Sequence, residues 1–312
     1  MIDAQHLGMQ FGPVTALADA TFDVRQGEVL GLLGPNGAGK STVMRILTTF
    51  LRPTRGSATV CGFDTVREPL QVRRRIGYLP ENPPLYLQME TGEYLDFVAR
   101  ARGLSGARLR DRLEWVLVRT GLTPMFHRPI GELSKGYRQR TALAQALVHD
   151  PEVIILDEPT TGLDPHQILE IRDLIRELAA AKTVIFSTHI LQEVEAIADR
   201  AVIISQGEVR ARGTLADLAL LAGVRAFGEA EVAAPFAEVG SALETAGFGR
   251  PELVREEGVW TRVRFSAPAA STGLEAISAL CAARSWGLRE LTMPGASLED
   301  AFLSLTQAEK AA

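Results

Sequence analysis

The sequence predicts an α/β fold with a parallel core sheet, followed by a smaller α+β domain. Two continuous apolar runs, 153–156 and 183–187, are rich in β-branched residues. Such runs are typical of strands that are buried on both faces of a parallel sheet. Between them, 165–181 has the apolar spacing of a helix. This alternation of strand and helix is the pattern of an α/β core.

The elements before and after these runs can be assigned in chain order. Residues 4–24 alternate apolar and polar side chains around the turn Phe11-Gly12-Pro13, which predicts antiparallel strands. Helical spacing extends over 91–122, with a break at 103–106. The remaining predictions are strands at 28–33, 57–60 and 76–80, a helix at 134–148, a hairpin of 201–204 with 207–210, and a helix at 215–221.

Small residues and glycine interrupt the pattern near 222–235, which predicts two domains, 1–222 and 223–312. The second domain reads as strand, helix, two strands, helix and strand, a βαββαβ order typical of a ferredoxin-like fold. Its predicted elements are a strand near Val224, a helix at 235–246, a hairpin of 252–255 with 259–265, a helix at 272–284 and a strand at 287–291.

Composition excludes several kinds of protein. A length of 312 residues suits two domains, and a net charge of −5 argues against nucleic acid as a partner. The two cysteines, Cys61 and Cys281, are far apart in sequence, which supports neither a zinc site nor a disulfide framework. The N-terminus lacks the features of a signal peptide, and no stretch approaches the ~20 apolar residues of a membrane helix. We therefore expect a reducing compartment and, for work at a membrane, a span supplied by another polypeptide.

A glycine-rich loop follows the apolar run 28–33 and precedes a helical segment. Glycines let the backbone curl so closely that several N–H groups face one anion, and the start of the next helix favours negative charge. In such a loop Lys40 reaches the terminal phosphates and the Ser41 hydroxyl binds Mg²⁺. The loop therefore predicts nucleotide binding by Gly34, Pro35, Asn36, Gly37, Ala38, Gly39, Lys40, Ser41 and Thr42.

Two carboxylates, Asp157 and Glu158, directly follow the buried run 153–156. Ligands of open α/β sheets bind at this end of the strands. Beside a phosphate loop, Asp157 is expected to hold Mg²⁺ through water, while Glu158 accepts a proton from the attacking water or orients it.

The segment Leu133-Ser134-Lys135-Gly136-Tyr137 has only the features of a helix cap when it is considered alone. Its position shortly before Asp157 and Glu158, with Asp164 after them and His189 after the next strand, changes that interpretation.

With these motifs in this order, residues 1–220 resemble the ATP-binding subunit of an ABC transporter. The resemblance implies a P-loop NTPase fold, with a mixed sheet core, an antiparallel β subdomain and a helical subdomain. It implies ATP and Mg²⁺ as cofactors. The roles that it implies are a signature segment at Ser134, Lys135, Gly136 and Tyr137, a magnesium carboxylate at Asp157, a catalytic base at Glu158, a D-loop aspartate at Asp164, a switch histidine at His189, an adenine-stacking ring at Phe11 and a Q-loop metal ligand at Glu81.

Four positions depart from the commonest sequence of the family. Phe11 stands in place of a tyrosine and keeps a stacking face. Lys135 and Tyr137 replace a glycine and a glutamine, whereas Ser134 and Gly136 can still offer a hydroxyl and a backbone N–H. Glu81 replaces a glutamine, which keeps an oxygen for Mg²⁺ but adds charge and removes a donor. We expect ATP binding to persist and the coupling to be altered.

The segments 78–86, 135–140 and 297–306 are similar to those of a bacterial subgroup that includes gliding-motility, drug and copper-site export ATPases. The family resemblance implies a head-to-tail dimer, in which each ATP lies between the phosphate loop of one subunit and the signature segment of the other. It also implies a separate membrane permease and a location on the cytoplasmic face of the inner (plasma) membrane. We expect residues 223–312 to stabilise or regulate the dimer.

Two other functions compete with this one. The first is a soluble ABC-type ATPase of DNA repair or translation, although the zinc cysteines, basic extensions and second cassette of such proteins are missing from the 312 residues. The second is a regulatory module that holds ATP without turnover, against which Glu158 and His189 both argue.

Overall fold

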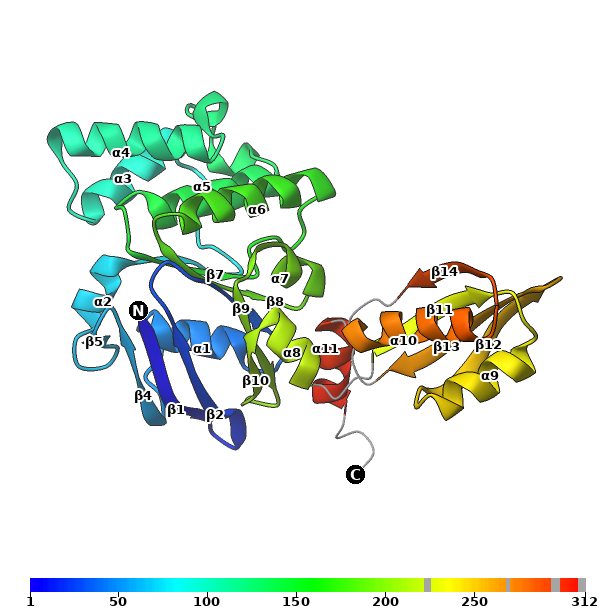
Figure 1. Cartoon of the computed structure of the whole chain (residues 1–312). Helices are drawn as coiled ribbons and strands as arrows, with labels where there is room; N and C mark the ends of the chain where they lie inside the picture. The colour runs from blue at the N-terminus through cyan, green and yellow to red at the C-terminus, as the bar shows by residue number, and fades with distance from the viewer. Residues whose placement is uncertain (222–225, 268–269, 293–297, 308–312) are drawn as a thin grey trace. The chain divides into compact units, whose positions relative to one another are not determined.

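The computed structural model describes residues 1–221, 226–267, 270–292 and 298–307. The chain divides into two compact units, Met1–Leu215 and Ala216–Ala312, which are described separately (Figure 1). The predicted boundary after residue 222 and the predicted strand near Val224 fall on 222–225, outside the described residues.

Within the described residues of the first unit, ten strands form one mixed sheet in the order β5-β4-β1-β2-β10-β9-β3-β8-β7-β6. The strands are β1 (Ile2–Phe11), β2 (Val14–Val24), β3 (Val29–Leu33), β4 (Arg55–Val60), β5 (Phe63–Asp64), β6 (Ile76–Leu79), β7 (Val153–Asp157), β8 (Thr183–Thr188), β9 (Arg200–Ser205) and β10 (Glu208–Thr214).

The sheet has a parallel part and an antiparallel part, as the sequence predicts. β9, β3, β8, β7 and β6 run parallel to one another, and every residue of β3, β7 and β8 is buried. β1 pairs antiparallel with β2 and β4, and β4 pairs antiparallel with β5. β10 joins the two parts, because it is antiparallel to β9 and pairs with β2 through Glu208 and Asp19. The predicted hairpin of 201–204 with 207–210 is thus confirmed as β9 and β10.

The helices of the first unit are α1 (Lys40–Leu47), α2 (Pro69–Arg75), α3 (Thr91–Ala101), α4 (Gly106–Arg119), α5 (Lys135–Leu147), α6 (Pro165–Ala179) and α7 (Leu191–Ile197). Figure 1 shows α3, α4 and α5 grouped together, and each of the three contacts the other two. This group is the predicted helical subdomain. The break at 103–106 separates α3 from α4, where Gly103 and Gly106 have the positive φ that glycine adopts without strain.

The described elements of the second unit are α8 (Leu215–Leu221, which begins at the last residue of the first unit), β11 (Ala226–Val232), α9 (Phe236–Thr245), β12 (Gly249–Glu257), β13 (Trp260–Ala267), α10 (Ala270–Ala283), β14 (Leu288–Thr292) and α11 (Leu298–Gln307). Residue 297, the first of the segment 297–306, lies outside the described residues.

The order β12-β13-β11-β14, antiparallel throughout, is the ferredoxin-like arrangement that the sequence predicts. One face of this sheet packs on both helices, through Val263 and Phe265 of β13, Val239 of α9 and Ile277 of α10. The alternate residues carry charge instead. They form ion pairs such as Arg264 with Glu229 at 2.7 Å and Arg289 with Glu231 at 3.2 Å.

In the part of the chain that the structure describes, no helix combines the length and the apolar character that are needed to cross a bilayer.

Candidate active site

The phosphate loop (Gly34–Thr42) leaves the end of β3 and enters α1. Two of its glycines are required by the space around them. A Cβ on Gly34 would lie 2.3 Å from the carbonyl oxygen of Ile204. Gly39 precedes the helix with a φ of 107°, and its Cβ would lie 2.7 Å from Leu17 and 2.8 Å from the carbonyl oxygen of Ala16. A larger residue would push the loop away from β9 at Gly34 and away from β2 at Gly39.

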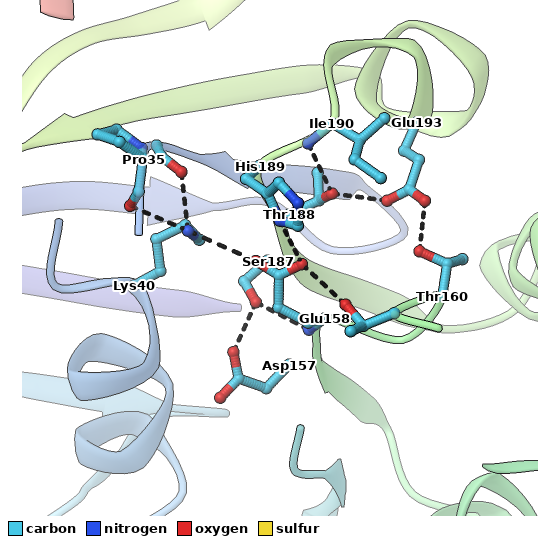
Figure 2. A network of polar contacts seen from close by, with 12 residues as sticks. Pro35, Lys40, Asp157, Glu158, Thr160, Ser187, Thr188, His189, Ile190 and Glu193 are labelled. Carbon is cyan, nitrogen blue, oxygen red and sulfur yellow. Dashed lines mark hydrogen bonds and ion pairs between the residues drawn. The ribbon is translucent and has the colours of Figure 1, made fainter. Parts of the chain in front are cut away.

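Lys40, the first residue of α1, points back into the curve of this loop (Figure 2). Its ammonium donates to the carbonyl oxygens of Gly34 at 2.8 Å and Pro35 at 3.2 Å. It also lies 3.5 Å from Glu158 Oε1, and both side chains are more than nine-tenths buried. The loop therefore holds one buried cation at the start of a helix, an arrangement that attracts phosphate.

Asp157 ends β7 and is nearly inaccessible. Its Oδ1 accepts hydrogen bonds from the hydroxyl of Ser41 at 3.1 Å and from the hydroxyl of Ser187 at 2.6 Å. Ser187 lies opposite Asp157 in the register of β7 with β8. The predicted pair of Ser41 and Asp157 is thus brought together, and a second hydroxyl from the neighbouring strand holds the carboxylate.

Glu158 follows in the left-handed region, with a φ of 49°, a conformation that a non-glycine residue adopts at a cost. Its N–H donates to Ser187 Oγ at 3.0 Å. Its Oε2 lies 2.9 Å from His189 Nδ1 and accepts from the Thr161 hydroxyl at 3.3 Å. The carboxylate is thus held between Lys40 on one side and His189 on the other (Figure 2).

Lys40, Glu158 and His189 line a pocket of about 560 Å³. The lining includes ten of the predicted residues, together with Ala16 and Thr161: the ten are Asn36, Gly37, Ala38, Gly39, Lys40, Ser41, Thr42, Glu81, Glu158 and His189. Glu81 reaches it from the segment after β6.

Four predicted nucleotide or metal residues are not part of the lining. Gly34 and Pro35 lie beneath it and contribute the carbonyl groups that Lys40 contacts, while Asp157 lies behind Ser41. Phe11 also lies outside it, at the end of β1, where it is 46% exposed and offers a ring to solvent.

None of the four signature residues lines the pocket of its own chain. Ser134 caps α5, where its hydroxyl accepts from Tyr137 N at 3.4 Å. Lys135 and Gly136 lie against the segment that contains Asp164. A Cβ on Gly162 would fall 1.8 Å from Lys135 Nζ, and one on Gly136 would fall 2.6 Å from the side chain of Gln167. Asp164 itself caps α6 in a capping box with Gln167.

Five residues around the site were not predicted from the sequence: Ala16, Thr160, Thr161, Ser187 and Glu193. Ser187 could have been found, because it ends the apolar run 183–187 as Asp157 follows the run 153–156, and the carboxyl ends of parallel strands share one edge. The others depend on contacts between distant segments, for which the sequence carries no local signal.

Comparison with known proteins extends these observations. Residues 17–161 match the family model of the ABC transporter. The ABC transporter ATP-binding protein NatA of Bacillus subtilis is 42% identical over 207 residues, which are 66% of this chain and 84% of that protein. The doxorubicin resistance ATP-binding protein DrrA of Mycobacterium tuberculosis is 40% identical over 215 residues, which are 68% of this chain and 64% of that protein.

Solved structures agree in fold. An ATP-binding subunit of an ABC transporter has a TM-score of 0.66 at 34% identity, over 71% of this chain and 92% of that one. A dimeric ATP-binding cassette in a post-hydrolysis state, bound to ADP and Pi, has a TM-score of 0.64 at 26% identity, over 69% of this chain and 99% of that one.

These matches support a transporter ATPase over the non-transport alternative and over a module without turnover. With its phosphate loop, its buried carboxylates and these relatives, the chain belongs to the family of ABC transporter ATP-binding proteins and is an ATPase.

Proposed function

We propose that this chain hydrolyses ATP with Glu158 as the base, and that a head-to-tail dimer of it powers a separate membrane permease. One observation carries the proposal: the buried Glu158 carboxylate lies 2.9 Å from His189 Nδ1 and 3.5 Å from Lys40 Nζ at the wall of one pocket. A base between a cation and a histidine can accept a proton from water while its neighbours hold the phosphates.

The hydroxyl of Ser41 and the carboxylate of Asp157 offer oxygen atoms of the kind that Mg²⁺ binds. Among the described residues, no group of three or more His, Cys, Asp or Glu side chains could hold a metal. Mg²⁺ does not need such a cage, because it binds through one or two protein oxygens and the phosphates of the nucleotide. We assign Ser41 and Asp157 to it, with Glu81 as a further oxygen from the same pocket. When bound, Mg²⁺ would neutralise charge on the phosphates.

In this proposal each residue of the site has one role. Lys40 and the loop N–H groups bind the phosphates, and Ser41 and Asp157 orient the metal. Glu158 takes the proton of the attacking water, and His189 contacts the γ-phosphate, while the ring of Phe11 stacks on the base.

The position of the signature segment supports a dimer. Ser134–Tyr137 lies outside the pocket of its own chain, so its Ser134 hydroxyl and Gly136 N–H would serve the ATP of a second copy. The post-hydrolysis cassette that this chain resembles is itself dimeric. Closure on ATP and opening after hydrolysis would then shift a two-state population. The second unit would stabilise or regulate this dimer.

We further propose that the partner is a permease, that it exports its substrate, and that it holds this subunit at the cytoplasmic face of the membrane. A daunorubicin and a doxorubicin resistance ATP-binding protein among the relatives support export.

The test is steady-state ATPase activity of Glu158→Gln, which keeps the size of the side chain and removes the base. We expect turnover to fall by about 10²–10⁴-fold, the usual contribution of a general base. The matched control is Glu195→Gln, the same change at an exposed position in α7, which should keep wild-type turnover. Unchanged turnover in Glu158→Gln would refute the role of Glu158.

A further inference from the structure

One buried carboxylate beside the site, that of Glu193, has no task in the proposed function. Glu193 lies in α7 and is only 2% exposed. Within the described residues it forms no ion pair with a lysine, arginine or histidine. Since a buried charged or polar group is costly unless it is hydrogen-bonded, its partners indicate what it does.

Those partners are two threonine hydroxyls from different segments (Figure 2). Thr160 Oγ1 donates to Glu193 Oε1, and Thr188 Oγ1 donates to Glu193 Oε2 at 2.6 Å. Thr188 Oγ1 in turn accepts from Ile190 N at 3.0 Å. Both hydroxyls are buried, with Thr160 5% exposed and Thr188 fully inaccessible. The carboxylate therefore bridges two chain segments that leave the ends of the adjacent strands β7 and β8.

Each threonine is close in sequence to one of the two residues proposed to act in hydrolysis, Glu158 and His189. Thr160 follows Glu158 by two positions, and Thr188 directly precedes His189. The intervening Pro159 is held as well, because its carbonyl oxygen accepts from Gln139 Nε2 at 3.0 Å. The bridge through Glu193 thus joins the two backbones on which the 2.9 Å contact of Glu158 with His189 depends.

We infer that Glu193 is a positioning residue that holds Glu158 and His189 in place relative to each other. It acts through Thr160 and Thr188 and touches neither the nucleotide pocket nor the reacting atoms. The inference rests on the proposed function, since it gives Glu193 a purpose only if Glu158 and His189 act in hydrolysis. The competing explanation is that Glu193 only stabilises the fold.

The experiment compares Glu193→Ala and Glu193→Gln with Glu195→Ala, in which an exposed carboxylate of the same helix is removed. Steady-state kinetics with Mg-ATP should show kcat lower by about 10–100-fold in both Glu193 variants, because misplacing a reacting group has such an effect, with KM changed less than about threefold. Glu195→Ala should match the wild type. If Glu193→Ala fails to fold, Thr188→Val removes one arm of the bridge and should lower kcat in the same way.

A double variant separates positioning from stabilisation of the fold. If Glu193 acts on the pair, its removal should change kcat less than about threefold in a His189→Ala background, since the pair is already broken. If the fold reductions in kcat of Glu193→Ala and His189→Ala multiply in the double variant, the inference is overturned. An unchanged kcat in folded Glu193→Ala would also overturn it. Glu158→Gln is measured in the same assay. If it keeps turnover, the proposed function fails; if it loses turnover while Glu193→Ala does not, only this inference fails.

Discussion

Replacing Ser187 with alanine tests how the site is held together. The Ser187 hydroxyl is fully buried at the end of β8. It donates to Asp157 Oδ1 at 2.6 Å and accepts from Glu158 N at 3.0 Å. One atom therefore supports both Asp157, the proposed metal ligand, and the backbone of Glu158, the proposed base. Alanine removes this atom and adds no other group.

The expected loss of stability follows from these two bonds. A hydrogen bond to a charged group is worth about 1.5–3 kcal/mol, and a buried N–H left without an acceptor costs about 1–3 kcal/mol. In the variant, Asp157 still accepts the hydrogen bond from the Ser41 hydroxyl at 3.1 Å. The energies of neighbouring contacts are also not fully additive. We expect Ser187→Ala to lower the free energy of unfolding by about 2–4 kcal/mol.

Urea denaturation followed by tryptophan fluorescence measures this change. The chain has three tryptophans. Trp115 lies in α4 of the first unit, and Trp260 and Trp286 lie in the second. A Trp260→Phe/Trp286→Phe background therefore reports the first unit alone. The midpoint should fall while the slope m stays constant, since the buried surface is unchanged.

The control is Ser57→Ala, at an exposed serine of β4, which should shift the free energy of unfolding by less than about 0.5 kcal/mol. If Ser187→Ala shifts the free energy of unfolding no more than this control does, the buried Ser187 hydroxyl does not stabilise the first unit.

Two further predictions concern the loop and pH. Gly39→Ala should destabilise the first unit by about 2–4 kcal/mol and abolish ATP binding in a titration, because it combines a φ of 107° with contacts at 2.7 and 2.8 Å. The control is Gly240→Ala in α9, where the nearest atom to the added Cβ lies 3.8 Å away. This variant should leave ATP binding unchanged and should keep or slightly raise the stability of the protein. Burial lowers the pKa of His149 from 6.5 to about 4, so below pH 6.5 the unfolded chain binds a proton that the folded chain does not. Stability from this group is present above pH 6.5 and is lost as the pH falls. Between pH 7 and pH 5 the free energy of unfolding should drop by about 2 kcal/mol more in the wild type than in His149→Gln, and equal drops would contradict this.

Much of the site could be predicted from the sequence, because its motifs are local. Gly34–Thr42 and the carboxylates at Asp157 and Glu158 each directly follow an apolar run that is short enough to be a buried strand. The order of α9, β12, β13, α10 and β14 in the second unit was also predictable, since turns separate segments of different period, whereas α11 was not predicted as a helix.

The features that could not be predicted from the sequence are short helices and contacts between residues that are distant in the chain. α2 and α7 were not predicted. Each has seven residues, and only Val72 of α2 and Glu193 and Val194 of α7 are buried, so neither helix shows an apolar stripe of helical period. The bridge from Glu193 to Thr160 requires that α7 lie beside the end of β7, and only the assembled sheet brings them together. The contact of Lys135 with Gly162 has the same origin.

The central proposal is that ATP, held by Lys40 of one copy, is closed in by Ser134 of another, and that Glu158 ends this state by hydrolysis. Its most direct measurement is the molar mass of Glu158→Gln in sedimentation velocity with Mg²⁺ and either ATP or ADP. We predict a dimer with ATP and a monomer with ADP, and a monomer with both nucleotides when Ser134→Arg is added. A Glu158→Gln chain that binds ATP and remains monomeric would contradict the account.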